Sequence, residues 1–155
     1  MAKMGSRGLN LEQGEAITLH ASAATAAIVS TNDTAVYIGG ERSRYIFILA
    51  VTAAATDADD TLDVYVDWSI DNVTFYNGGR FTQVLGNGGA VSYYMVFDAT
   101  TPGTSVIAVT SDAAAGAVRP QLFGAYVRSR YVCTEGAGGG AAGFTFSVKG
   151  YASTV

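Results

Sequence analysis

Residues 61–85 read TLDVYVDWSIDNVTFYNGGRFTQVL, and the first ten of these positions decide the fold class. Aspartate, tyrosine and serine alternate there with apolar side chains, which are Leu62, Val64, Val66, Trp68 and Ile70. A period of two is that of a β-strand with one apolar and one polar face. The stretch therefore predicts an antiparallel strand over 61–70, with these five apolar residues in a core and the aspartates in solvent.

The sequence around this strand predicts further strands and turns. Asn77-Gly78-Gly79 predicts a hairpin turn between short strands at 73–76 and 80–85. The stretch 44–54 is apolar on both faces, which predicts a central strand covered on each side. Other strand patterns, separated by turns rich in Gly, Asn and Asp, lie at 15–22, 35–38, 90–97, 104–110, 122–134 and 144–150. The whole predicts an all-β fold, an antiparallel β-sandwich or jelly-roll-like domain of about eight or nine strands.

The chain divides into a short arm and one domain. Residues 1–14 are polar and lack periodicity, which predicts a flexible N-terminal arm. Residues 15–155 have the length of one domain with a single core, to which the closing strand would add Phe144, Phe146 and Val148. An arm can add a strand to the sheet edge of a neighbour through main-chain hydrogen bonds. Leu9 and Leu11 of the arm are therefore candidate interface residues.

The composition favours a protein partner over nucleic acid or membrane. Hydrophobic residues make up 49% of the chain and charged residues only 14%, so part of the apolar surface is expected to contact another protein. The net charge is −4 and the basic residues are scattered, which argues against direct nucleic-acid binding. The sequence has neither the apolar core of a signal peptide nor a membrane-span-length apolar segment, which predicts a protein made in the cytoplasm without a membrane anchor.

Four residues of the domain are further interface candidates. Arg128 and Arg130 share one face of the strand pattern at 122–134, where an interface or ion pairs would use them. Tyrosines also suit interfaces, because the ring is buried while the hydroxyl group forms a hydrogen bond. The candidates are therefore Arg128, Arg130, Tyr126 and Tyr151.

The acidic residues form no convincing metal or catalytic pattern. Asp57, Asp59 and Asp60 could supply oxygen ligands to a cation, but the glycine and glutamate of an EF-hand loop are missing, and an exposed acidic turn is the preferred interpretation. Asp63 and Asp67 are about 13 Å apart along a strand, farther than glycosidase carboxylates.

Nucleophilic catalysis also lacks its components. His20 is the only histidine and Cys133 the only cysteine, and the two lie far apart in the sequence. Cys133 lies in an apolar run and is expected to be a small buried residue. No Ser-His-Asp set can be assembled with a serine beside His20. The sequence therefore predicts a protein that is not an enzyme and needs no cofactor.

Three blocks, LDVYVDWSIDNVTFYNGGRFTQVLG, AYVRSRYVC and GFTFSVKG, resemble small structural proteins of tailed bacteriophages. The matching positions are Leu62, Val64, Val66, Ser69, Asp71, Phe75, Phe81, Thr82, Gln83, Val84, Tyr126, Val127, Arg128 and 144–148. The resemblance implies an all-β virion protein made in the host cytoplasm, in the first place a head decoration (cement) protein. Such proteins are commonly homotrimers that bind the major capsid protein on the capsid surface, where subunits meet.

Two alternatives stay open at this point. One is a tail, neck or fibre component of the same kind of particle. The other is a carbohydrate-binding module that uses exposed tyrosines and Trp68 as an aromatic platform on a β-sandwich.

Overall fold

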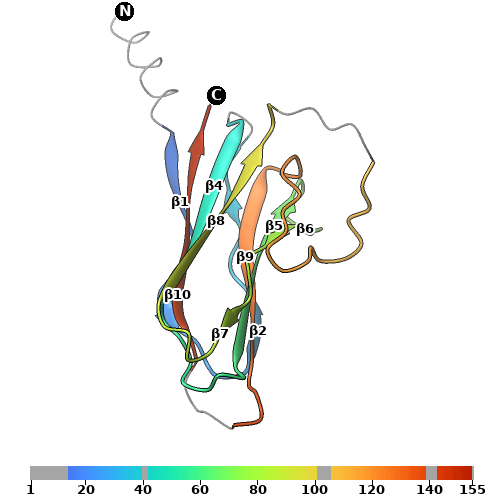
Figure 1. The fold of residues 1–155 in the computed structure, drawn as a ribbon. Coiled ribbons are helices and arrows are strands. Elements are labelled where there is room, and N and C mark those ends of the chain that lie inside the picture. Colours follow the sequence, from blue (N-terminus) through green and yellow to red (C-terminus); the bar gives the residue numbers. More distant parts are fainter. Residues whose placement is uncertain (1–13, 40–41, 101–105, 139–142, 155) are drawn as a thin grey trace, which may run out of the picture.

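The computed structural model describes residues 14–39, 42–100, 106–138 and 143–154 (Figure 1). This part of the chain is all-β, and none of it forms a helix that could cross a membrane. The strands are β1 (Glu15–Ala24), β2 (Val29–Asn32), β3 (Val36–Tyr37), β4 (Arg44–Ala53), β5 (Thr61–Ser69), β6 (Tyr76–Arg80), β7 (Val84–Leu85), β8 (Val91–Asp98), β9 (Tyr126–Thr134) and β10 (Thr145–Ser153).

The strands form two antiparallel sheets that pack face to face (Figure 1). One sheet has the order β1-β10-β4-β8, and the other has the order β2-β9-β5-β6, with β3 paired to β9 and β7 paired to β5. In the first sheet, neighbouring strands come from distant parts of the sequence, since β10 lies between β1 and β4. The predicted antiparallel β-sandwich is confirmed.

The core lies between the sheets and is centred on Trp68. Its ring centroid lies 5.2 Å from those of Tyr45 and Phe97 and 5.8 Å from that of Phe123. These edge-to-face and tilted contacts are favourable for aromatic quadrupoles. Seven of the eight predicted core residues are buried there: Leu62, Val64, Val66, Trp68, Phe144, Phe146 and Val148.

The prediction for Ile70 is wrong, because 78% of this residue is exposed. Strand β5 ends one position earlier, at Ser69. The carboxylate of Asp71 then accepts hydrogen bonds from the backbone N–H groups of Val73 and Thr74, each at 2.9 Å. This local turn takes the chain out of the sheet before Ile70 can continue the alternation.

The predicted hairpin turn at Asn77-Gly78-Gly79 is also wrong, since these residues lie inside β6. A Cβ atom on Gly78 would lie 2.5 Å from Cδ1 of Trp68, so glycine permits close packing here rather than a turn. The amide of Asn77 donates to the carboxylate of Asp67 on the paired strand at 2.9 Å. The connection between β5 and β6 is instead the segment 70–75.

Strand β4 is central in its sheet, as predicted, but only one of its faces is covered. Tyr45, Phe47, Leu49 and Val51 are buried against the second sheet, whereas 47% of Ile48 is exposed on the opposite face. The predicted strand at 104–110 also differs, because its described part, 106–110, contains no strand. Strand β2, by contrast, was not predicted.

Candidate interaction surfaces

The polar side of β5 is buried rather than solvated, contrary to the prediction. Asp63 and Asp67 are only 8% and 3% exposed. Arg80 Nη2 lies 2.6 Å from Asp63, and Arg130 Nε donates to Asp67 at 2.9 Å. We call these two aspartates with Arg80, Arg128 and Arg130 the arginine layer. Alternation identified the two faces of β5, but the ion pairs show why the polar face can also be buried.

Aromatic rings and a neighbouring segment cover the arginine layer. The guanidinium carbon of Arg130 lies 3.9 Å from the ring centroid of Tyr65, and that of Arg128 lies 3.8 Å from the centroid of Phe75. These distances suit cation–π contacts. Burial lowers the pKa of the Arg128 guanidinium, although the charge of Asp67 acts in the opposite direction.

The segment that covers the arginine layer, residues 112–118, runs beside β6. The backbone N–H of Ala113 donates to Asn77 at 2.8 Å, and Val118 forms an isolated β-bridge with Gly79. Asp112 accepts a hydrogen bond of 2.6 Å from Arg130. The polar face of the β9–β5–β6 region is therefore closed by the chain itself.

The predicted interface residues do not form one surface. Arg128 and Arg130 interact with Asp67 inside the chain, so their contact with a partner stays a prediction. Tyr126 lies on the outer face of β9, with its ring 5.1 Å from that of Tyr37. Tyr151 lies on the outer face of β10, in the other sheet. The two tyrosines thus lie on opposite sides of the sandwich, whereas Leu9 and Leu11 lie outside the described residues.

The outer side of the β1-β10-β4-β8 sheet has a group of apolar residues near its centre, bordered on β10 by the exposed Lys149, which lies opposite Ile48. Ile46 lies opposite Val96 on β8 and opposite Tyr151 on β10, and Ile48 lies opposite Tyr94. The exposed fractions are 47% for Ile48, 75% for Tyr94 and 46% for Tyr151. We call these five residues the outer apolar face. The apolar character of both sides of 44–54 was the sequence signal for it.

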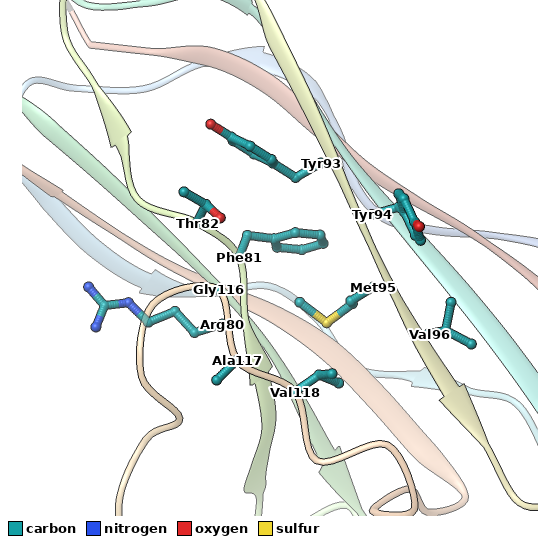
Figure 2. A pocket seen from close by; sticks show the side chains of 10 residues that line it. All are labelled: Arg80, Phe81, Thr82, Tyr93, Tyr94, Met95, Val96, Gly116, Ala117 and Val118. Carbon is teal, nitrogen blue, oxygen red and sulfur yellow. The ribbon is translucent and has the colours of Figure 1, made fainter.

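A groove follows the free edge of β8. One hollow of about 330 Å³ is lined by residues that include Phe81, Tyr93, Met95 and Val118. A second hollow of about 250 Å³ continues along β8 between Val91, Tyr93 and Leu85. Figure 2 shows Tyr93 and Met95 on the side of β8 that faces Phe81, and Tyr94 and Val96 on the other side. We call the two hollows together the β8 groove.

Part of the acidic loop packs against the rest of the chain. Asp60 is only 2% exposed, and its carboxylate accepts a hydrogen bond of 2.8 Å from the backbone N–H of Gly136. The preferred interpretation as an exposed turn is therefore wrong for Asp60. Within the described ranges, no three His, Cys, Asp or Glu side chains are grouped as a metal site would require.

His20 belongs to a buried polar cluster. Its Nδ1 lies 3.0 Å from Asp33, and the hydroxyl of Ser129 donates to the same carboxylate. The imidazole stacks on Phe146 with centroids 4.4 Å apart. The hydroxyl of Ser129 bonds to Asp33 and not to the imidazole of His20. His20 is therefore not placed to act as the base for Ser129 as a nucleophile.

Cys133 is buried, as expected. It is 2% exposed, and its sulfur lies 3.3 Å from the hydroxyl of Thr25. Burial raises the pKa of the thiol, which opposes formation of the reactive thiolate.

Asp98, at the end of β8, is expected to make the stability of the protein depend on pH in the acid range. The hydroxyl and the N–H of Thr100, followed by Arg44, donate hydrogen bonds that hold the pKa of Asp98 at about 2. Its folded pKa is below the unfolded value of about 3.9, so its stabilisation is present above pH 4 and is lost as the pH falls towards 2.

Urea unfolding of the wild type and Asp98→Asn at pH 7, 4 and 2.5 tests this expectation. The difference in unfolding free energy between the two proteins should shrink as the pH falls. A difference that is the same at all three pH values would contradict the assigned role of Asp98.

Comparisons with known proteins show a similarity of fold. Neither the protein-family models nor the curated proteins gave a match. Among solved structures, the chain is similar to one in the structure of infectious bursal disease virus, Gx strain, with a TM-score of 0.53 and 11% sequence identity. The match covers 92% of this chain but only 32% of the viral chain. This chain therefore spans about a third of the length of its structural neighbour.

Proposed function

We propose that this chain is a non-enzymatic structural protein of a virus particle. More specifically, we propose a capsid decoration protein of a tailed bacteriophage, bound as a homotrimer to the major capsid protein where capsid subunits meet. Residues 1–14 would act as its arm and residues 15–155 as its single domain. The sequence resemblance supports the particle type, and the fold shared with a chain of a virus structure is compatible with it.

The outer apolar face is the observation that carries this proposal. Ile48 and Tyr94 lie side by side on neighbouring strands, and a soluble domain gains by covering such a surface. A rigid sheet presenting aliphatic and tyrosine side chains suits a large protein surface such as a capsid shell. The carbohydrate alternative is not favoured, because Trp68 is 1% exposed and cannot serve as a sugar platform.

Binding of an outer-face variant to particles tests the proposal. Ile48→Glu introduces a charge into the proposed contact, so binding to particles stripped of this protein should weaken at least tenfold. Ile28→Glu is the matched control, since Ile28 is 69% exposed and lies outside this face. Both variants should retain the β-sheet circular dichroism of the wild type.

Electron microscopy of the particle that carries the chain gives the second readout. We expect density for the sandwich at junctions between capsid subunits, with the β1-β10-β4-β8 sheet towards the shell. Density at the tail or neck would overturn the decoration role. Equal binding of Ile48→Glu and the wild type would exclude the outer apolar face as the contact.

A further inference from the structure

The β8 groove lies beside an unusually open sheet edge. Strand β8 pairs with β4 in one unbroken register from Val91 to Asp98. Among the described residues, no strand pairs with its other edge. Unpaired edges invite an additional strand, because their N–H and C=O groups are in position to form hydrogen bonds.

The other sheet edges are less suitable for an added strand. The pairing of β1 is interrupted by register shifts around His20, and bulges of this kind protect edges. Strand β2 has only four residues. Along β6, Arg80 donates its N–H to Ala117, and Arg119 donates its N–H to Gly78. Of these edges, β8 alone combines length, regular pairing and adjacent space.

The hydrogen bonds at the end of β8 identify which groups face the open edge. Ala99 donates its N–H towards β4, to Ser43, whereas Asp98 donates its N–H away from β4, to Pro120. Backbone groups of alternate residues point to opposite edges of an antiparallel strand. The N–H and C=O groups of Ser92, Tyr94 and Val96 therefore point towards the groove, and Pro120 limits it at one end.

The groove requires a strand with apolar residues at alternate positions. Side chains on its inner face would enter the hollows beside Tyr93 and Met95, and those on its outer face would lie next to Tyr94 and Val96. Residues 8–13 read GLNLEQ, in which Leu9 and Leu11 alternate with Asn10 and Glu12. Two residues along a strand span about 6.6 Å, so the leucines could fill neighbouring hollows along β8.

The same copy of the chain cannot supply these leucines. Gly14 adjoins the start of β1, and a strand added outside β8 would be four strand spacings away, about 19 Å. Leu11 is three residues before Gly14 and can reach at most about 11 Å, and Leu9 can reach about 18 Å. A second copy has no such restriction.

We propose that residues 8–13 of a second copy bind in the β8 groove as an added antiparallel or parallel strand. Leu9 and Leu11 enter the hollows, and the main chain pairs with Ser92, Tyr94 and Val96. Each copy donates its arm to one neighbour and accepts an arm from another, which is a heterologous contact that can close into a ring. This inference rests on the proposed homotrimer and names the contact between its copies, and the exchange of arms occurs without a particle.

Molar mass in solution tests the inference on the isolated protein. The full chain should be an oligomer, and both a variant lacking residues 1–13 and the double variant Leu9→Asp/Leu11→Asp should be monomers. Tyr94→Pro should also be monomeric, because proline removes an N–H that faces the groove and not β4. Tyr94→Ala is the matched control, which keeps this N–H and should remain oligomeric.

A peptide experiment keeps the test independent of variant folding. A synthetic peptide of residues 1–13 should bind the truncated protein and shift the NMR amide signals of Ser92, Tyr94 and Val96. The same peptide with both leucines replaced by aspartate should bind at least tenfold more weakly. A monomeric full chain, an oligomeric truncated chain, or peptide shifts away from β8 would each overturn the proposal.

Discussion

Replacing Asp67 by alanine is expected to lower the free energy of unfolding by about 3 kcal/mol. Its carboxylate is buried and lies 2.9 Å from Arg130 Nε and 3.7 Å from Arg128 Nη2, and it also accepts a hydrogen bond from Asn77. Removing it leaves two partly buried cations and an amide without this acceptor. The cost is that of uncompensated buried charge, which exceeds the net stabilisation by the intact pair.

Asp112→Ala is the matched control for this prediction. Asp112 also pairs with Arg130, at 2.6 Å, but 46% of its side chain is exposed. Water can replace a partner of this kind, so the control should lose less than about 1 kcal/mol. Urea unfolding followed by circular dichroism at one protein concentration measures both variants. Equal losses for Asp67→Ala and Asp112→Ala would show that burial does not decide the strength of these pairs.

Asp67 also shows where the sequence is sufficient to predict the structure and where it is not. Alternation along 61–69 correctly predicts a strand and its core-facing residues, because side-chain direction in a strand follows from backbone geometry. Whether the second face is wet depends on what packs over it. Here that cover comes from β9 and the segment around Asp112 and Ala113, and no local pattern in β5 specifies this.

Gly78 and Ile70 are two further positions at which a local sequence pattern does not predict the structure. Asn-Gly-Gly is a strong local turn signal, yet Gly78 lies in a strand because the indole of Trp68 occupies the space of a Cβ atom. Ile70 continues the alternation in the sequence, but the turn around Asp71 ends the strand first. Tertiary packing and one side-chain hydrogen bond each override a local pattern.

The candidate surfaces were less predictable than the core. The sequence shows that 44–54 is apolar on both faces. The interpretation of this pattern as a strand covered on both sides did not predict that one of these faces, the outer apolar face, is exposed. The β8 groove arises from a β8 edge, the 80–89 region and the segment 116–118 together. Separate stretches of sequence cannot reveal a space that exists only between them. By contrast, Leu9 and Leu11 of the arm were interface candidates from the sequence alone.

Trp68→Ala is expected to be the most destabilising single core substitution, with a loss of about 4 kcal/mol. The indole is 1% exposed and contacts rings from both sheets, including Tyr45 on β4 and Phe97 on β8. Gly78 lets the backbone of β6 pack directly against the indole, and Phe123, in the connection before β9, also contacts the ring. The surrounding strands cannot collapse into the space without breaking their pairing, so much of the cavity would remain.

Trp68→Phe is the control, because an aromatic ring of smaller volume keeps part of the contact with Tyr45 and Phe97. It should lose clearly less stability than Trp68→Ala. Urea unfolding by circular dichroism measures both variants, since the alanine variant has no tryptophan to report by fluorescence. A loss below about 1 kcal/mol for Trp68→Ala would mean that the two sheets are joined mainly by other contacts. That result would contradict the role assigned to the aromatic centre, which is to hold the β1-β10-β4-β8 sheet against the other sheet. The position of the outer apolar face depends on the same contacts.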